Sequence, residues 1–272
     1  MTYRVEIIRA FKNPRFKISM TIALTFIAYH ILFWNLPRSM ALEIPENPTI
    51  CPPSLYNCWL GLDFAFPYTQ IYYWVLPILA TFPFAGSFFT DRKKGYIKNI
   101  LMRENRGAYL KGKCLAVVLS SSCIVGVPLL IDLFVSAMLL PAIVPQVTTY
   151  MFPISIVGMW CDFYYSWPLL YIFAFILIDM LFISCFVLTS LIVSRFCKYE
   201  VEALLFPSLI NLIIYFICSW WGETQYSSAY FLIPYQPSLN TSIYIVLFEF
   251  VVLSLINYFL FYHWGKKHDI SL

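Results

Sequence analysis

Long stretches without charged residues constrain this chain more than any other feature of its sequence. Residues 18–37, 64–90 and 203–222 contain no Lys, Arg, Asp or Glu. An α-helix rises about 1.5 Å per residue, so about 20 apolar residues cross the roughly 30 Å of hydrocarbon in a bilayer. Soluble domains carry about 25% charged residues, whereas this chain carries 12%. The sequence therefore predicts an all-α membrane protein.

Three more apolar stretches are each interrupted by a single acid, Asp132, Asp179 or Glu249. Together the stretches predict one transmembrane domain over residues 1–272 with six membrane-spanning helices. The expected spans are 17–36, 69–90, 114–140, 167–194, 203–221 and 243–264. The apolar run of the first span exceeds the about 7–15 residues of a signal-peptide core, so we interpret it as a permanent helix.

Basic residues predict the orientation, because cytoplasmic loops accumulate Lys and Arg. The N-terminal segment has five, loop 91–113 has eight, loop 195–202 has two and the C-terminal tail has two. The remaining loops carry only Arg38. This alternation predicts that both termini are cytoplasmic and that the number of spans is even. It also accounts for the net charge of +4 without a nucleic-acid partner, since the inner leaflet is anionic.

The first 13 residues have an amphipathic pattern that ends before Pro14. One helical face would carry aromatic and aliphatic side chains, those of Tyr3, Ile7, Ile8 and Phe11. The other would carry polar ones, those of Thr2, Glu6, Arg9 and Asn13. The pattern favours a helix lying in the cytoplasmic membrane interface over a flexible basic tail.

Two outer segments leave alternatives open. The sequence CPPSLYNC places Cys51 and Cys58 where oxidation is possible, and it is compatible with a disulfide or with two free thiols. The apolar stretch 230–235, YFLIPY, is either a short re-entrant piece covered by protein or an aromatic interfacial loop.

Residues 107–114, GAYLKGKC, approach the pattern of a glycine-rich phosphate-binding loop. Cys114 stands where Ser or Thr would bind Mg²⁺, and a thiol is a poor ligand for a hard cation. The preceding residues are polar and basic rather than a buried strand, and a membrane span follows. We therefore interpret Gly112 as a bend and Lys113 as a headgroup anchor. With no G-x-S-x-G or H-E-x-x-H motif and three scattered histidines, we expect no enzyme activity and no cofactor or metal in this chain.

The acids within the spans have two interpretations. An ionised Asp at mid-membrane costs ~2.5–3.5 kcal/mol. Asp179 lies near the middle of the fourth span, and Asp132 and Glu249 lie in the outer halves of theirs. Together with His30 they form a candidate translocation path, or they form hydrogen bonds between helices. We favour helix contacts for Asp132 and Glu249 and leave both interpretations open for Asp179.

Loop 91–113, DRKKGYIKNILMRENRGAYLKGK, is the remaining candidate site, with eight basic and two acidic residues. Apolar residues fall near one helical face, namely Ile97, Ile100, Leu101 and Ala108. A helix with this pattern would lie across the membrane surface and offer its side to a cytosolic partner. The alternative is a short solvated linker that is basic only because of the topology.

This loop resembles that of a known family. The order is R-x-K-G, then I-L, then a basic residue, then Y-L-x-G-K before an apolar helix. The matching residues are Arg92, Lys94, Gly95, Ile100, Leu101, Arg106, Leu110, Gly112 and Lys113. The pattern resembles the membrane (permease) subunits of six-helix ABC-type exporters, most strongly over residues 85–130. It departs from the family where Glu104-Asn105-Arg106 replaces the common Thr-Pro before Ser-Arg.

The resemblance implies a transport subunit in the bacterial cell membrane. Cytosolic ABC ATPase subunits, which hold ATP and Mg, would bind loop 91–113 as a coupling helix. Two copies of this chain, or this chain and a similar permease, would form the pore. The residues implied at the ATPase contact are Arg92, Lys94, Gly95, Ile97, Ile100, Leu101, Arg103, Arg106, Gly112 and Lys113. The many aromatic and few charged residues suit an amphipathic or apolar cargo such as a peptide, a lipid or a drug.

Two other functions are open alternatives. A partner-independent secondary transporter would show repeated halves with interrupted helices; no repeat is visible, but Pro77, Pro83 and Pro128 fall within expected spans. A polytopic membrane enzyme ranks last, because no catalytic set is recognisable.

Overall fold

The described part of the chain is entirely helical. The computed structural model describes residues 2–41, 52–102, 104–146, 154–238, 240–263 and 265. Helices account for 75% of the structure, and these residues contain no strand. The all-α expectation is therefore confirmed.

Five helices are long and apolar enough to cross a membrane. The first is α2 (Pro14–His30), which continues through a π-helical turn, η1 (Ile31–Asn35), into α3 (Leu36–Met40). The others are α8 (Arg106–Leu139), α10 (Pro168–Val193), α11 (Glu200–Trp220) and α13 (Ile243–Asn257), the last continued by the π-helical η3 (Tyr258–His263). They correspond to the expected first, third, fourth, fifth and sixth spans, and they are compatible with a multi-pass membrane protein.

The expected second span is not one helix. It consists of α5 (Thr69–Thr81) and α6 (Ser87–Lys93), separated by turns over residues 82–86. Pro83 lies in the break, where its carbonyl accepts a hydrogen bond of 2.8 Å from the Asn13 side chain. A Cβ on Gly86 would lie 2.5 Å from the Glu200 carboxylate, so a larger residue there would require the Glu200 side chain to shift. Asn13 and Glu200, both distant in sequence, therefore lie against the break between α5 and α6.

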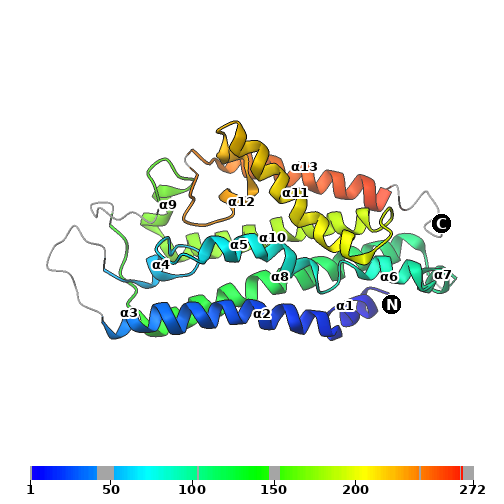
Figure 1. The fold of residues 1–272 in the computed structure, drawn as a ribbon, viewed down its shortest axis with the longest axis horizontal. Helices are drawn as coiled ribbons and strands as arrows, with labels where there is room; N and C mark the ends of the chain where they lie inside the picture. The colour runs from blue at the N-terminus through cyan, green and yellow to red at the C-terminus, as the bar shows by residue number, and fades with distance from the viewer. Residues whose placement is uncertain are drawn as a thin grey trace.

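The long helices form an elongated bundle with α8 and α10 at its centre (Figure 1). The most apolar stretches of α8 and α10 are 50% and 56% buried within the protein, whereas that of α13 is 11% buried. Since most side chains of α13 face outward, its surface is available to lipid or to another chain.

The connecting segments gather at the two ends of the bundle (Figure 1). One end carries α1 (Thr2–Lys12), α6, α7 (Tyr96–Leu101) and the turn at 194–199. We call it the basic end, because most Lys and Arg residues lie there. The opposite end carries α4 (Leu55–Cys58), α9 (Cys161–Ser166), η2 (Thr224–Tyr226) and α12 (Ser228–Phe231).

The apolar stretch 230–235 is covered by protein rather than spread over a surface. Phe231, Leu232 and Ile233 are buried. The carbonyl of Pro234 accepts a hydrogen bond of 2.7 Å from the hydroxyl of Tyr171 on α10. Its depth in a membrane is not fixed by these contacts, so the re-entrant interpretation stays a prediction.

Candidate functional site

Four charged side chains form a buried ionic cluster at the basic end, which we call the Lys113 cluster: Glu6, Arg9, Asp91 and Lys113. The Lys113 ammonium lies 2.5 Å from Asp91 Oδ2 and 3.0 Å from Glu6 Oε2. Arg9 completes the network with contacts of 2.7 Å to Glu6 Oε1 and 2.7 Å to Asp91 Oδ1. The two positive and two negative charges of the cluster cancel, which reduces the free-energy cost of burying these side chains.

This arrangement corrects the expected roles of Gly112 and Lys113. Lys113 is fully buried, and its ammonium lies 4.5 Å from the centre of the Phe84 ring. Gly112 lies inside α8, where a Cβ would meet the Tyr3 backbone at 3.5 Å. The helix α8 begins at Arg106 rather than at residue 114, and α1 packs against it. Lys113 is therefore an internal ion-pair partner, not a headgroup anchor, and neither residue is exposed to a cytosolic partner here.

Asp91 is the centre of the Lys113 cluster. It accepts from Lys113 and Arg9 and also from the Tyr109 hydroxyl at 3.2 Å. Burial by itself would raise the pKa of Asp91, but the Lys113 ammonium and the Arg9 guanidinium together lower it below its ordinary value. The carboxylate therefore stays ionised and connects α6 to α1 and α8.

Helix α1 packs on the protein with its polar face. It ends at Lys12, after which the Asn13 side chain accepts from the Arg15 amide at 3.1 Å and so caps α2. Glu6 is fully buried, whereas Val5 and Ile8 are 44% and 42% exposed. The helix predicted for residues 1–13 is present over Thr2–Lys12, and its exposed side chains are the apolar Tyr3, Val5 and Ile8 together with the basic Arg4 and Lys12, a mixture compatible with an interfacial helix.

The segment that joins α6 to α7 presents cations at the tip of the basic end. Gly95 adopts a left-handed conformation with φ of +70°, which lets the chain turn between the two helices. Ile97 is buried, and Ile100 and Leu101 pack against the core, so the apolar side of α7 faces inward. Lys94 and Lys98 point outward and are exposed.

The remaining residues of loop 91–113 have different surroundings. The Arg92 guanidinium donates to the backbone carbonyls of Arg195 and Cys197 and so holds α6 against the turn at 194–199. Arg106 is half-buried at the first turn of α8. Arg103 lies outside the described residues. The expected single coupling helix is thus a pair of short helices, α6 and α7, followed by the start of α8.

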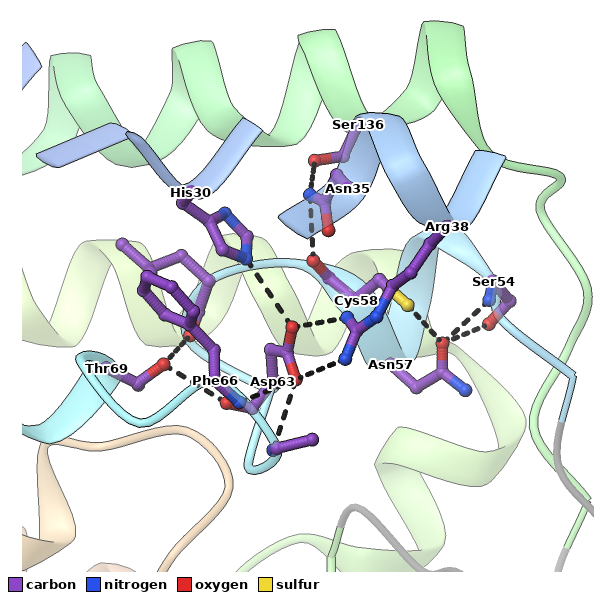
Figure 2. A network of polar contacts seen from close by, with 12 residues as sticks. His30, Asn35, Arg38, Ser54, Asn57, Cys58, Asp63, Phe66, Thr69 and Ser136 are labelled. Carbon is purple, nitrogen blue, oxygen red and sulfur yellow. Dashed lines mark hydrogen bonds and ion pairs between the residues drawn. The ribbon is translucent and has the colours of Figure 1, made fainter. Parts of the chain in front are cut away.

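A second polar cluster lies at the opposite end and comprises His30, Arg38, Asp63 and Asp132; we call it the His30 cluster. His30 Nδ1 lies 2.8 Å from Asp132 Oδ1, and its Nε2 lies 3.5 Å from Asp63 Oδ2. Figure 2 shows His30 and Arg38 both directed toward the Asp63 carboxylate. Ionised carboxylates only accept hydrogen bonds, so the imidazole serves both when it carries two N–H groups.

The π-helical turn η1 and the loop before α5 assemble this second cluster. In η1, Asn35 turns inward and donates to Ser136 Oγ at 2.9 Å and to the Cys58 carbonyl at 3.2 Å (Figure 2). Asp132 also accepts from the Leu60 amide at 2.8 Å. Asp132 therefore makes contacts between helices and loops, which agrees with the interpretation we favoured for it.

The pKa of Asp63 is set by burial and by its neighbours His30 and Arg38. Burial by itself would raise the pKa of Asp63, but hydrogen bonds from His30 and Arg38 lower it below its ordinary value. Arg38 Nη1 lies 2.5 Å from Asp63 Oδ2. The ion pair therefore contributes to stability when Asp63 is ionised.

Replacing Arg38 with glutamine should lower the free energy of unfolding by about 1.5–3 kcal/mol at neutral pH, the range for hydrogen bonds to charged groups. The folded pKa of Asp63 is below the unfolded value of about 3.9, so its contribution is complete above that value and is lost as pH falls through the folded one. The deficit of Arg38→Gln should therefore shrink below about pH 4. Thermal unfolding in detergent across this pH range measures it. A deficit that is equal at every pH would mean that Arg38 acts by packing on Trp34.

The other candidate path residues are separate from this cluster. Asp179 is fully buried in α10, and neither carboxyl oxygen makes a hydrogen bond with the described residues. The Tyr73 hydroxyl of α5 approaches it without meeting hydrogen-bond geometry. Glu249 is half-buried on α13. Of the four residues of the candidate translocation path, only His30 and Asp132 are in contact with each other in the described part of the chain.

The expected cysteine pair is described only in part. Cys58 is a buried free thiol in α4, and burial raises its pKa to about 11. Cys51 lies outside the described residues, so the disulfide stays a prediction.

The comparisons with known proteins add no family. Protein-family models, curated proteins and solved structures gave no match to this chain.

The sequence argument missed Glu6, Asp91 and Asp63 as site residues. Asp63 is one of several acids in the outer loop, and nothing in the sequence selects it except that Arg38 is the lone cation there. Glu6 was assigned to the polar face of the first helix, but its partner Lys113 is 107 positions away. Such pairings follow from the packing of helices, not from local patterns.

Proposed function

We propose that this chain is the transmembrane permease subunit of an ATP-binding-cassette exporter that moves an amphipathic or apolar substrate outward. A separate cytosolic ATPase would drive it. The observation that carries the proposal is the α6–α7 segment, residues 87–101. It projects from the basic end, presents Lys94 and Lys98 to solvent, and is held to the long helices by buried ionic contacts.

Movement of α6 by a bound ATPase would be transmitted to the membrane helices through ionic and hydrogen-bonded contacts. Asp91 at the end of α6 is bonded to Lys113 on α8 and to Arg9 on α1. Arg92 fixes the same helix to the turn between α10 and α11. A partner that moves α6 would therefore move α8 directly, and α10 and α11 through the turn between them. Charge-assisted contacts are strong and geometrically defined, so these helices would move together.

We also propose six membrane crossings. Helix α1 and the end of η3 both lie at the basic end (Figure 1). A chain that starts and finishes at one end crosses an even number of times, and five long helices give an odd number. Helix α5 supplies about 20 Å of helical rise, and the turns over residues 82–86 carry the chain on to α6 at the basic end, so we assign the sixth crossing to α5 with these turns.

The coupling role predicts a charge effect at the α6–α7 segment. The double variant Lys94→Glu/Lys98→Glu should weaken binding of the partner ATPase about tenfold, because reversed charges disturb a complementary interface. Co-purification with an ATPase encoded beside this chain, followed by titration in detergent, measures the affinity. Both side chains are exposed, so thermal stability should not change.

The matched control is Arg4→Glu/Lys17→Glu, which makes the same charge change at exposed positions of the basic end outside the segment. If both double variants weaken binding equally, the attraction is a general one and the coupling role is wrong. If no ATPase binds and the chain transports alone, the exporter proposal as a whole fails.

A partner-independent secondary transporter is the second candidate, because α5 and α6 form the kind of interrupted helix that such proteins use at their substrate sites. Asp179 faces α5 within the bundle. Uptake driven by an ion gradient, measured with the purified chain alone in liposomes, decides between the two functions.

A further inference from the structure

A mostly apolar groove of about 420 Å³ runs along the outside of the bundle near the basic end. We call it the Lys111 groove. It lies between α8, α10 and the π-helical η3. Its walls include Leu115 and Val118 of α8, Leu188 of α10 and Tyr262 of η3, and Lys111 lies at its rim. In a membrane-spanning bundle this position opens to the acyl chains of the leaflet at the basic end.

Two cations near this groove have no carboxylate partner among the described residues, and Arg92 likewise donates only to backbone carbonyls there, whereas three other cations of the basic end form ion pairs. Arg9, Arg15 and Lys113 each contact a carboxylate. Lys111 and Arg195 contact none among the described residues. The Lys111 ammonium lies 5.3 Å from the centre of the Tyr262 ring, and the Arg195 guanidinium lies 4.9 Å from that of the adjacent Phe261.

Arg195 is incompletely satisfied. Its terminal nitrogens donate to the carbonyls of Leu260 and Phe261, at 3.2 and 2.7 Å. Its Nε is buried with no hydrogen-bond partner. Burial lowers the pKa of Arg195 against an opposing effect from Cys114, and the nearby Arg106 guanidinium lowers it further. A nearby anion would relieve this electrostatic strain.

A polar atom deeper in the groove is also unsatisfied. Asn257 lines the groove and is 6% exposed. Its Nδ2 donates to the Cys185 carbonyl at 2.9 Å, but its Oδ1 has no partner. Buried polar groups are rarely left unpaired, and no donor among the described residues reaches this oxygen.

We propose that the Lys111 groove binds one anionic phospholipid. Its phosphate lies at the rim beside Lys111, with the Arg195 guanidinium close by against the ring of the lining residue Phe261, and one acyl chain lies along Leu115, Val118 and Leu188. The combination of Lys111 at the rim, a second cation behind the Phe261 ring and an apolar wall matches the two parts of such a lipid. This site does not depend on the proposed transport function.

Native mass spectrometry of the detergent-purified full chain tests the site with three probes: dioleoyl phosphatidylglycerol, dioleoyl phosphatidylcholine and inorganic phosphate. Phosphatidylglycerol should bind with the highest affinity. Lys111→Gln should weaken that binding about fivefold, and Lys111→Gln/Arg195→Gln about 30-fold, since each cation near an anionic headgroup contributes a similar factor. Lys98→Gln, an exposed cation away from the groove, should leave binding unchanged.

A steric variant keeps the test decisive if Arg195→Gln disturbs folding. Leu115→Trp narrows the groove without changing charge and should also abolish tight phosphatidylglycerol binding. Equal binding of both lipids, unaffected by Lys111→Gln, would overturn the proposal. So would inorganic phosphate binding as tightly as the lipid, which would indicate a free-anion site. A dimer that Leu115→Trp dissociates, without bound lipid, would show that a second copy of the chain occupies the groove.

Discussion

Replacing Lys113 with methionine should lower the free energy of unfolding by about 3–5 kcal/mol, the usual loss when one partner of a buried ionic group is removed. The ammonium is fully buried between Glu6 and Asp91. Without it, two carboxylates remain in the interior with only Arg9 to balance them. Unfolding in mixed micelles by added dodecyl sulfate measures the change.

Lys111→Met is the matched control for this prediction. Lys111 lies on the same helix two residues earlier and is exposed, so its replacement should cost less than about 1 kcal/mol. Adding Glu6→Gln to Lys113→Met restores the charge balance and should recover part of the stability. An equal loss for Lys111→Met and Lys113→Met would mean that the Lys113 cluster does not hold α1 to the bundle.

Replacing Asp179 with leucine should stabilise the protein, in contrast to Lys113→Met. It should raise the free energy of unfolding by about 2–3 kcal/mol. Neither oxygen of Asp179 has a partner among the described residues, and leucine has the same branched shape without the desolvation cost. A buried group that destabilises the fold is typical of functional sites. The substitution should therefore stabilise the chain and abolish transport if the residue lies on the substrate path.

The same substitution at Asp132 supplies the contrast. Asp132→Leu leaves the Leu60 amide and the His30 ring without their acceptor, so it should destabilise by about 1–3 kcal/mol. If Asp179→Leu destabilises as much as Asp132→Leu, Asp179 has a structural role that its contacts do not reveal. Full transport by Asp179→Asn would separate it from the mechanism.

The helices were predictable because their signal is local. Run length and charge, read along the sequence, identify five of the six expected spans, and Pro14 identifies the boundary between α1 and α2. The break after Thr81 was not predictable, because Pro83 alone is compatible with a kinked helix. Asn13 and Glu200, which lie against the break, are distant in sequence.

The ionic clusters show the limit of sequence patterns more directly. Loop 91–113 contains eight basic residues, and nothing local distinguishes the buried Lys113 from the exposed Lys111. The difference arises because α1 packs over the first turns of α8. Likewise, the sequence grouped His30 with Asp132 in the candidate path, but its second neighbour Asp63 became visible only when η1 and the outer loop were placed together.

The contacts of α1 set an order of events during synthesis. Its first described residues leave the ribosome before any partner exists, since Asp91 lies 82 positions after Arg9 and Lys113 lies 107 positions after Glu6. At about 5–20 residues per second, translation takes roughly 5–20 s to produce them. During that time the apolar side of the helix can rest on lipid while its charges stay in water. Docking of α1 is then a late step, because it requires that α6 and the start of α8 are already in place.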